Sequence, residues 1–317
     1  MSDIILVTIP FTETQKKKIA DAAAPEKVTF LKASEITDEQ LQNAEVIIGN
    51  VDPTVVSAAG KLKWMQLNSA GANQYIPKGI LAEETVLTCA SGAYAQSVTE
   101  AMISATMALY RRVTDYYDNQ KKHLWKDEGD FQSPYGATVV VLGLGNIGCA
   151  YARIMKAMGS YVIGLKKHPG EKPDCVDELY TIEYFDECLK RADLVACILP
   201  GTAETKGMIG KKQLKAMKST AYLLNFGRGN SVDSMALYEA LKAGEIAGAA
   251  LDVTDPEPLP ADHILWDAPN ILITPHCAGK FHIPVTLDNI SDIVAANLKH
   301  YLKGEPLEHV VNRKLGY

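Results

Sequence analysis

The chain has 317 residues, 47% of them hydrophobic and 22% charged, which is the balance of a globular protein with room for about two domains. Its formal net charge of −6 excludes a general attraction to nucleic acid or an anionic membrane, so an anionic ligand requires local positive charge. No apolar run approaches the roughly 20 residues of a membrane span, so we expect no membrane-spanning segment.

The first third of the chain alternates short β-rich apolar runs with helical stretches. Strands are expected at residues 4–9, 28–31, 45–49, 62–67 and 86–89. Helices are expected between them at residues 16–24 and 37–43. Strands that alternate with helices pair in parallel, so this part predicts a layered α/β domain.

One long helix is predicted next, because apolar residues from Val98 to Tyr116 follow helical spacing. The sequence from Ser97 to Glu100 reads SVTE, which is typical of a capping box at a helix start. The polar residues 123–135 that follow predict an irregular connector.

A second α/β series begins at Thr138, and it bears a nucleotide motif. Strands are expected at residues 138–142, 161–165, 194–199, 221–225, 247–251 and 271–273. Helices are expected at residues 147–158, 184–190, 235–243 and 285–302, with Asp233 as the N-cap of the third. The chain therefore predicts two doubly wound α/β units.

The nucleotide motif, GLGNIG, matches G-x-G-x-x-G between a predicted strand and a predicted helix. Gly143 permits a tight turn, Gly145 lets the backbone approach a pyrophosphate, and Gly148 allows close helix–strand packing. Asn146 and Ile147 lie at the helix start, where free N–H groups and the helix dipole favour phosphate. The motif predicts a dinucleotide cofactor.

The ribose selector is expected at the end of the next strand, where the chain carries Lys166 and Lys167. An NAD enzyme usually has an acidic residue there to hold the ribose 2′-hydroxyl. Two lysines attract a 2′-phosphate instead, which favours NADP(H). If they are ordinary solvated loop charges, NAD(H) is accepted as well.

Three residues with catalytic side chains follow three strands of the second unit. Arg228 lies in NFGRG, Glu257 in LDVTDPEP and His276 in TPHCAG. Open α/β sheets place ligands at the carboxyl ends of their strands. An Arg, a Glu and a His at that edge together predict a hydride-transfer site.

The order GLGNIG, NFGRG, LDVTDPEP, TPHCAG resembles the D-isomer-specific 2-hydroxyacid dehydrogenase family over nearly the whole chain. The resemblance implies hydride transfer between NAD(P)H and a small 2-keto or 2-hydroxy acid, with the D-isomer expected. It implies a smaller, flavodoxin-like substrate-binding domain of residues 1–98 and 287–317. It further implies that a Rossmann dinucleotide domain of residues 99–286 is inserted in that domain, and that a homodimer forms largely through the dinucleotide domain.

The resemblance also assigns roles to the three catalytic residues. Arg228 would bind the substrate carboxylate and polarise the 2-keto oxygen, because its planar fork suits an oxyanion. His276 would donate the proton to that oxygen during reduction and remove it during oxidation. Glu257 would orient His276 and stabilise its protonated form.

Further contacts are implied by the resemblance alone. Cofactor contacts would come from Asp252, which either holds the nicotinamide carboxamide or only caps a loop, and from Leu199, Pro200, Phe226, Gly227 and Gly279. Substrate contacts would come from the backbone N–H groups of Ala70 and Gly71 and from the side chain of Tyr94. Trp125 corresponds to a tryptophan that in some members reaches a neighbouring subunit's site; an interface aromatic is the simpler interpretation.

Cysteine spacing and the chain ends bear on compartment and subfamily. The six cysteines form no C-x-x-C pair and no metal-ligand spacing, which predicts reduced thiols and no metal. The N-terminal residues lack a signal-peptide pattern, so we expect a cytoplasmic protein. No regulatory extension follows Tyr317, which disfavours the long phosphoglycerate dehydrogenases. Residues after Gly279, such as Phe281, match no common family form, so no subfamily is assigned.

An alternative function comes from a different class. Related transcriptional corepressors use the same scaffold as dinucleotide-sensing interaction proteins. Those proteins carry tails or peptide-binding extensions, which this chain lacks. Turnover of 2-keto acids distinguishes the two functions.

Overall fold

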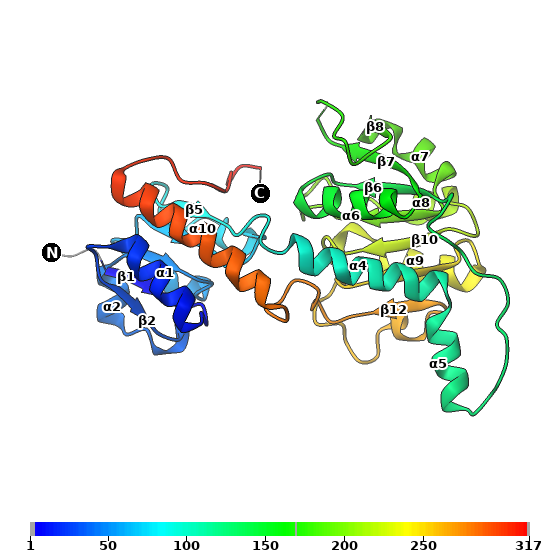
Figure 1. Ribbon diagram of the computed structural model, residues 1–317, viewed down its shortest axis with the longest axis horizontal. Coiled ribbons are helices and arrows are strands. Elements are labelled where there is room, and N and C mark those ends of the chain that lie inside the picture. The colour runs from blue at the N-terminus through cyan, green and yellow to red at the C-terminus, as the bar shows by residue number, and fades with distance from the viewer. Residues whose placement is uncertain (1–3, 169, 316–317) are drawn as a thin grey trace. The chain divides into compact units, whose positions relative to one another are not determined.

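The computed structural model describes residues 4–168 and 170–315 (Figure 1). The chain forms two compact units, one of Met1–Tyr94 with Lys280–Tyr317 and the other of Ala95–Gly279. The second unit is therefore an insertion in the first. The predicted substrate domain also includes residues 1–3 and 316–317, which lie outside the described residues.

The sheet of the first unit contains, within the described residues, five strands in the order β2-β1-β3-β4-β5. All its pairings are parallel, and this order is that of a flavodoxin-like sheet, as predicted. Its strands are β1 (Ile4–Val7), β2 (Val28–Phe30), β3 (Ala44–Ile48), β4 (Trp64–Gln66) and β5 (Val86–Thr88).

Helices cover this sheet, and two from opposite ends of the chain pack against each other. They are α1 (Glu13–Ala23) and α10 (Pro284–Lys303), which lie side by side in Figure 1. Gln15 of α1 donates a 2.7 Å hydrogen bond to Asp288 of α10. The short helices α2 (Asp38–Asn43) and α3 (Pro53–Val56) complete the unit.

In the second unit, the described residues form a seven-stranded parallel sheet of order β12-β11-β10-β9-β6-β7-β8. The chain adds strands from β6 towards one edge of the sheet and then, from β9 onwards, towards the other edge, as in a Rossmann fold. In such sheets the ligand crevice lies at the carboxyl ends of the two strands where this order reverses, here β6 and β9. The strands are β6 (Thr138–Leu142), β7 (Tyr161–Lys166), β8 (Glu178–Thr181), β9 (Leu194–Cys197), β10 (Tyr222–Asn225), β11 (Gly248–Leu251) and β12 (Ile271–Ile273).

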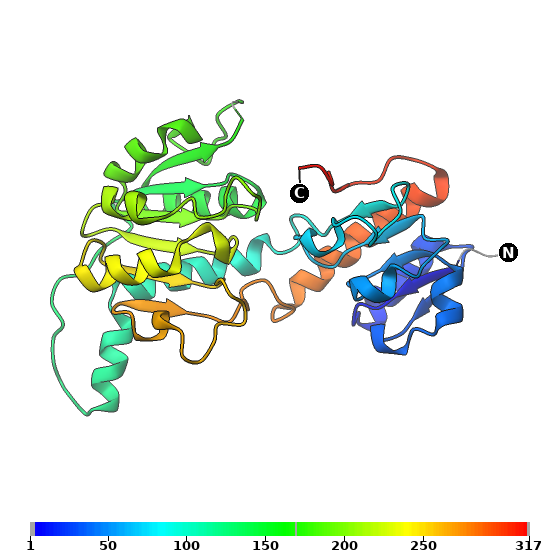
Figure 2. The same ribbon diagram turned by 180° about the vertical axis from the view of Figure 1, so that it is seen from behind.

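Helices cover both faces of this sheet, so its central strands are buried on both sides and read as continuous apolar runs (Figures 1 and 2). One face carries α4 (Ala95–Tyr110) and α6 (Asn146–Ala157). The other carries α7 (Phe185–Arg191), α8 (Lys211–Ala216) and α9 (Ser234–Ala243). Asp233 caps α9 by accepting from the Ala236 N–H at 3.0 Å, which confirms the predicted N-cap.

The predicted single helix up to Tyr116 is wrong, because two helices occupy this region. Helix α4 ends at Tyr110, and α5 (Val113–Lys121) starts after Arg112, whose φ of 53° breaks the helix. The predicted capping box is also wrong: α4 begins at Ala95, and the Ser97 hydroxyl donates to the Ala278 carbonyl at 2.6 Å. A long-range partner thus replaces the local one.

One short strand, β8, and two short α-helices, α3 and α8, were not predicted. Each has four to six residues, too few for a periodic pattern to stand out. Helix α5 and the connector that follows it along the chain extend beyond the sheet in Figure 1. No helix within residues 4–168 and 170–315 has the length and apolar character needed to cross a membrane.

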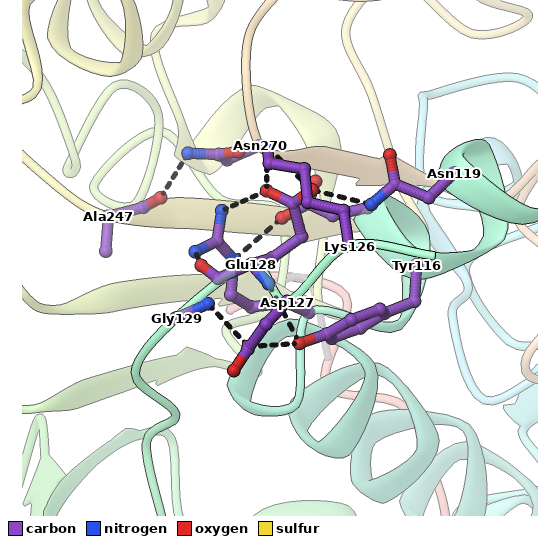
Figure 3. Close-up of polar contacts among 10 residues, drawn as sticks. Tyr116, Asn119, Lys126, Asp127, Glu128, Gly129, Ala247 and Asn270 are labelled. Atoms are coloured by element: carbon purple, nitrogen blue, oxygen red, sulfur yellow. Dashed lines mark hydrogen bonds and ion pairs between the residues drawn. The ribbon is translucent and has the colours of Figure 1, made fainter. Parts of the chain in front are cut away.

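The predicted irregular connector is confirmed, and polar contacts anchor it to α5 (Figure 3). Asn119 donates to Glu128 at 2.5 Å, and the Tyr116 hydroxyl donates to Asp127 at 3.0 Å. Arg112 donates to the Glu128 carbonyl. The connector therefore has a defined path beside α5.

Candidate active site

The His276 imidazole and the Glu257 carboxylate are in direct contact. Glu257 lies in the segment after β11 and His276 in the segment after β12, and these neighbouring strands pair with Leu251 opposite Ile273. The Nδ1 atom of His276 lies 2.5 Å from Oε1 of Glu257. Both side chains remain accessible, with 48% and 40% of their surfaces exposed.

Arg228 follows β10, the strand on the other side of β11. Burial lowers the pKa of its guanidinium, and the nearby Glu257 carboxylate opposes this by favouring the charged form. Its Nη1 donates to the Gly227 carbonyl at 2.8 Å. The structure thus brings Arg228, Glu257 and His276 to one edge of the sheet.

The turn that carries Arg228 is held by Asn225 and two glycines. Asn225 is fully buried; its amide donates to the Arg228 carbonyl and accepts from the Gly227 N–H. A Cβ on Gly227 would lie 2.6 Å from backbone atoms of Leu199, and one on Gly229 would lie 1.9 Å from the Thr254 carbonyl oxygen. Only glycine permits this backbone packing.

Asp252 organises the loop that carries His276. The residue is 4% exposed. Its carboxylate accepts hydrogen bonds from the Thr274 hydroxyl and from the N–H groups of Cys277 and Ala278. His276 itself has a φ of 46°, a left-handed conformation that is uncommon for a non-glycine residue. The loop is thereby held in one conformation.

The glycine loop has the shape that a pyrophosphate requires. Gly143 has a φ of 93°, and a Cβ there would lie 2.7 Å from the Ile198 carbonyl oxygen. A Cβ on Gly148 would lie 2.0 Å from the Gly143 carbonyl oxygen. At Gly145 nothing lies within 4 Å of the Cβ position. Helix α6 starts at Asn146, followed by Ile147, so its N-terminus adjoins this open space, and the residues fit a dinucleotide phosphate.

The remaining cofactor candidates lie at the same strand ends. Lys166 ends β7, and the side chain of Lys167 pairs with Glu204 at 2.6 Å. Leu199 and Pro200 follow β9, where the Pro200 carbonyl accepts from Thr205. Phe226 is buried beside β9, with its N–H bonded to the Cys197 carbonyl, and Gly279 ends this unit.

The substrate candidates Ala70, Gly71 and Tyr94 belong to the first unit and lie together there. The Tyr94 hydroxyl donates to the Asn68 carbonyl, at the start of the loop that contains Ala70 and Gly71. Burial raises the pKa of Tyr94 to about 12, so it remains a neutral donor. The Ser69 hydroxyl donates to the Gly71 carbonyl at 2.6 Å and stiffens the same loop.

Sequence reasoning missed Asn225 and Glu204. Asn225 is the first residue of the NFGRG motif. A polar residue at the end of an apolar strand, directly before a glycine turn, was the feature of the sequence that could have indicated its role. Nothing in the sequence links Glu204 to Lys167, because their contact depends on strand order. The part of the chain that is described has no cluster of three or more His, Cys, Asp or Glu that could hold a metal ion.

Comparison with known proteins identifies the family. The model of the "D-isomer specific 2-hydroxyacid dehydrogenase, NAD binding domain" matches residues 103–278, which is more than half of the chain. The chain belongs to this family. As a 2-hydroxyacid dehydrogenase it is an oxidoreductase that uses a nicotinamide dinucleotide, as the motifs predicted.

Individual relatives of this 2-hydroxyacid dehydrogenase agree in sequence and fold. A glyoxylate reductase of Korarchaeum cryptofilum is 31% identical over 93% of this chain and 89% of its own length. The NADPH-dependent glyoxylate/hydroxypyruvate reductase of Sinorhizobium meliloti, solved with NADP and sulfate, is 26% identical with a TM-score of 0.84 and full coverage of both chains. A D-isomer specific 2-hydroxyacid dehydrogenase of Lactobacillus delbrueckii ssp. bulgaricus, solved in its NAD-complexed form, is 28% identical with a TM-score of 0.76, covering 98% of this chain and all of its own.

Proposed function

We propose that this dehydrogenase reduces a small 2-keto acid to the D-2-hydroxy acid, with NADP(H) preferred and NAD(H) accepted. The observation that carries the proposal is the 2.5 Å contact between His276 and Glu257 at the sheet edge that also bears Arg228. A proton donor, its carboxylate partner and a cation for an acidic substrate meet there.

His276 is the acid and base of the proposed reaction. Its Nδ1 is engaged by Glu257, so Nε2 is the ring atom that exchanges a proton with the substrate. During reduction Nε2 donates its proton to the 2-keto oxygen, and during oxidation it removes the proton from the hydroxyl. Glu257 fixes the ring orientation through its contact with Nδ1.

Arg228 binds the substrate carboxylate and stabilises charge on the 2-keto oxygen. Partial burial strengthens both interactions, because water competes less for the guanidinium. We assign residues 1–98 and 287–317 to the substrate-binding domain, where the N–H groups of Ala70 and Gly71 hold the carboxylate. Tyr94, a neutral donor, lies beside this loop in the same unit.

Residues 99–286 form the dinucleotide domain of the proposal. When bound there, the nicotinamide supplies the hydride. The loop of Gly143, Gly145 and Gly148 and the N-terminal residues Asn146 and Ile147 hold the pyrophosphate. The nucleoside halves contact Leu199, Pro200, Phe226, Gly227, Asp252 and Gly279.

The NADP(H) preference rests on the two lysines at the end of β7. Lys166 and Lys167 stand where an acidic ribose holder would select NAD(H). Their charge attracts the 2′-phosphate of NADP(H).

The free thiols of all six cysteines support placement in the reducing cytoplasm.

We also propose that the enzyme is a homodimer whose interface includes α5 and the connector. Trp125 is fully exposed in the single chain, and Tyr117, Leu124 and Phe131 expose between 44% and 58% of their surfaces. Large apolar side chains gathered on one projecting segment are typical of a protein interface. A second copy of the chain is the partner expected from the family.

The test of the proposed function is turnover. Glyoxylate, hydroxypyruvate, pyruvate and branched 2-keto acids are assayed with NADPH and NADH. We expect His276→Ala to lower kcat by about 10²–10⁴-fold, as expected for loss of a general acid. His309→Ala is the matched control, since His309 is exposed and also has a left-handed φ, of 56°. Dinucleotide binding without any turnover would instead indicate the dinucleotide-sensing class of protein.

A further inference from the structure

An ion pair joins two loops on either side of the glycine loop. The Nζ atom of Lys167 lies 2.6 Å from Oε2 of Glu204. Lys167 comes directly after β7, and Glu204 lies in the loop after β9. Both side chains are partly exposed, at 46% and 63%, so a ligand from solvent can reach them.

Sheet order places this ion pair at the reversal point of the sheet. Strand β6 lies between β7 and β9, and its last residue, Leu142, is opposite Leu165 on one side and Cys197 on the other. Gly143, the next residue, donates its N–H to the Leu165 carbonyl and packs against Ile198. The ion pair therefore links the two loops that border the crevice where open α/β sheets bind nucleotides.

The turn that carries Glu204 is fixed by its neighbours. The Thr202 N–H donates to the Thr205 hydroxyl, and the Thr205 N–H donates to the Thr202 hydroxyl. The Thr205 hydroxyl also donates to the Pro200 carbonyl at 2.6 Å. Glu204 is thus presented to Lys167 from a defined turn.

We propose that Glu204 determines how strongly the enzyme discriminates between NADP(H) and NAD(H), by competing with the 2′-phosphate for Lys167. This inference rests on the proposed nucleotide site. A 2′-phosphate that binds Lys167 must displace Glu204 and then lies near its negative charge. An NAD(H) ribose carries a neutral hydroxyl, so the ion pair persists and Glu204 can accept from that hydroxyl. Glu204 thus weakens NADP(H) binding and leaves room for NAD(H).

The test measures binding, so it does not depend on turnover. Calorimetry gives the Kd of NADPH, NADH and the fragments 2′,5′-ADP and 5′-AMP for the purified full chain. We expect Glu204→Gln to tighten NADPH and 2′,5′-ADP by about three- to tenfold, the range of one exposed ion pair plus relieved repulsion. NADH and 5′-AMP should bind with an unchanged or slightly larger Kd.

Two variants make the test specific. Glu239→Gln removes the carboxylate of another exposed ion pair of the same unit, with Lys211 at 3.3 Å, and should change no Kd. In a Lys167→Gln background, Glu204→Gln should lose most of its effect on NADPH, because the contested cation is gone. The inference is overturned if Glu204→Gln raises the affinity for NADPH and NADH equally. It is also overturned if Glu204→Gln raises the affinity for NADPH to the full extent in the Lys167→Gln background. A wild-type chain that binds no dinucleotide overturns the proposed function itself, whereas binding with an unchanged NADPH-to-NADH ratio in Glu204→Gln overturns only the role of Glu204.

Discussion

The backbone N–H of His276 donates a 2.8 Å hydrogen bond to the carbonyl oxygen of Asp252. The carboxylate of the same aspartate accepts from the N–H groups of the next two residues, Cys277 and Ala278. Asp252 thus holds the His276 loop through both its backbone and its side chain. Hydrogen bonds from several N–H and O–H donors to one buried carboxylate are strong, so they hold the loop firmly.

Asp252→Asn should destabilise this loop. The amide keeps only one acceptor oxygen, and its NH₂ group would face the N–H and O–H donors that now bind the carboxylate. A buried donor without a partner reduces stability by about 1–3 kcal/mol. We expect a Tm lower by about 2–6 °C and a kcat lower by about tenfold or more, since His276 loses its fixed position. Thr274→Val, which removes one donor only, should have a smaller effect. An unchanged Tm and kcat in Asp252→Asn would contradict the holding role.

Gly145 and Gly148 should respond differently to an added side chain. The Cβ position of Gly145 faces open space at an ordinary φ of −79°, so Gly145→Val should keep its Tm within about 2 °C. The new side chain fills the space for the pyrophosphate, so NADPH affinity should fall about 100-fold or more. Gly148→Ala should instead lower the Tm, because its Cβ would meet the Gly143 carbonyl. Undiminished NADPH binding by Gly145→Val would remove this loop from the cofactor site.

Glu178 should make the stability of the second unit depend on pH. The Arg191 guanidinium contacts both carboxylate oxygens at 2.7 and 2.8 Å, and with the hydroxyls of Tyr161 and Tyr180 it holds the pKa of Glu178 well below its ordinary value of 4.5. A lowered folded-state pKa gives stability that is present above 4.5 and is lost as the pH falls through the folded pKa.

The variant that tests this dependence is Glu178→Gln. Its Tm and that of the wild type are measured by calorimetry from about pH 7 to about pH 3. We expect a Tm about 3 °C below that of the wild type at neutral pH, with the difference shrinking under acid conditions. Glu183→Gln, an exposed glutamate of the following turn, is the control and should shift the Tm little. A difference that stays constant down to the lowest pH would refute the linkage.

Trp125→Ala tests the proposed dimer interface. Removing an aromatic anchor from an interface typically weakens association by about 2 kcal/mol or more, or roughly thirtyfold in Kd. Light scattering coupled to gel filtration should show a dimer for the wild type and dissociation of the variant at low micromolar concentration. Trp266→Ala, at an exposed tryptophan outside the connector, should remain dimeric. A monomeric wild type would refute the dimer, and an unaffected variant would exclude Trp125 from its interface.

Local pattern predicted much of the fold. The strands at residues 138–142 and 271–273 were predicted with the bounds that the structure has, because apolar runs between turn residues are visible in the sequence. The helix start near Ser97 was mispredicted, since its hydroxyl has a partner 181 positions away, at Ala278. The break at Arg112 also has no local breaker residue: Arg112 has a left-handed φ and pairs with Asp115 and Glu128.

Residues a few positions apart specify the glycine loops, caps and apolar runs, so the catalytic motifs and their position after strands can be recognised without a structure. Tertiary structure alone decided which of these motifs meet: Glu257 with His276, Asp252 with the loop that follows β12, and Lys167 with Glu204. The reason is that strand order brings segments far apart along the chain to one edge of a sheet, and no short-range pattern encodes that order.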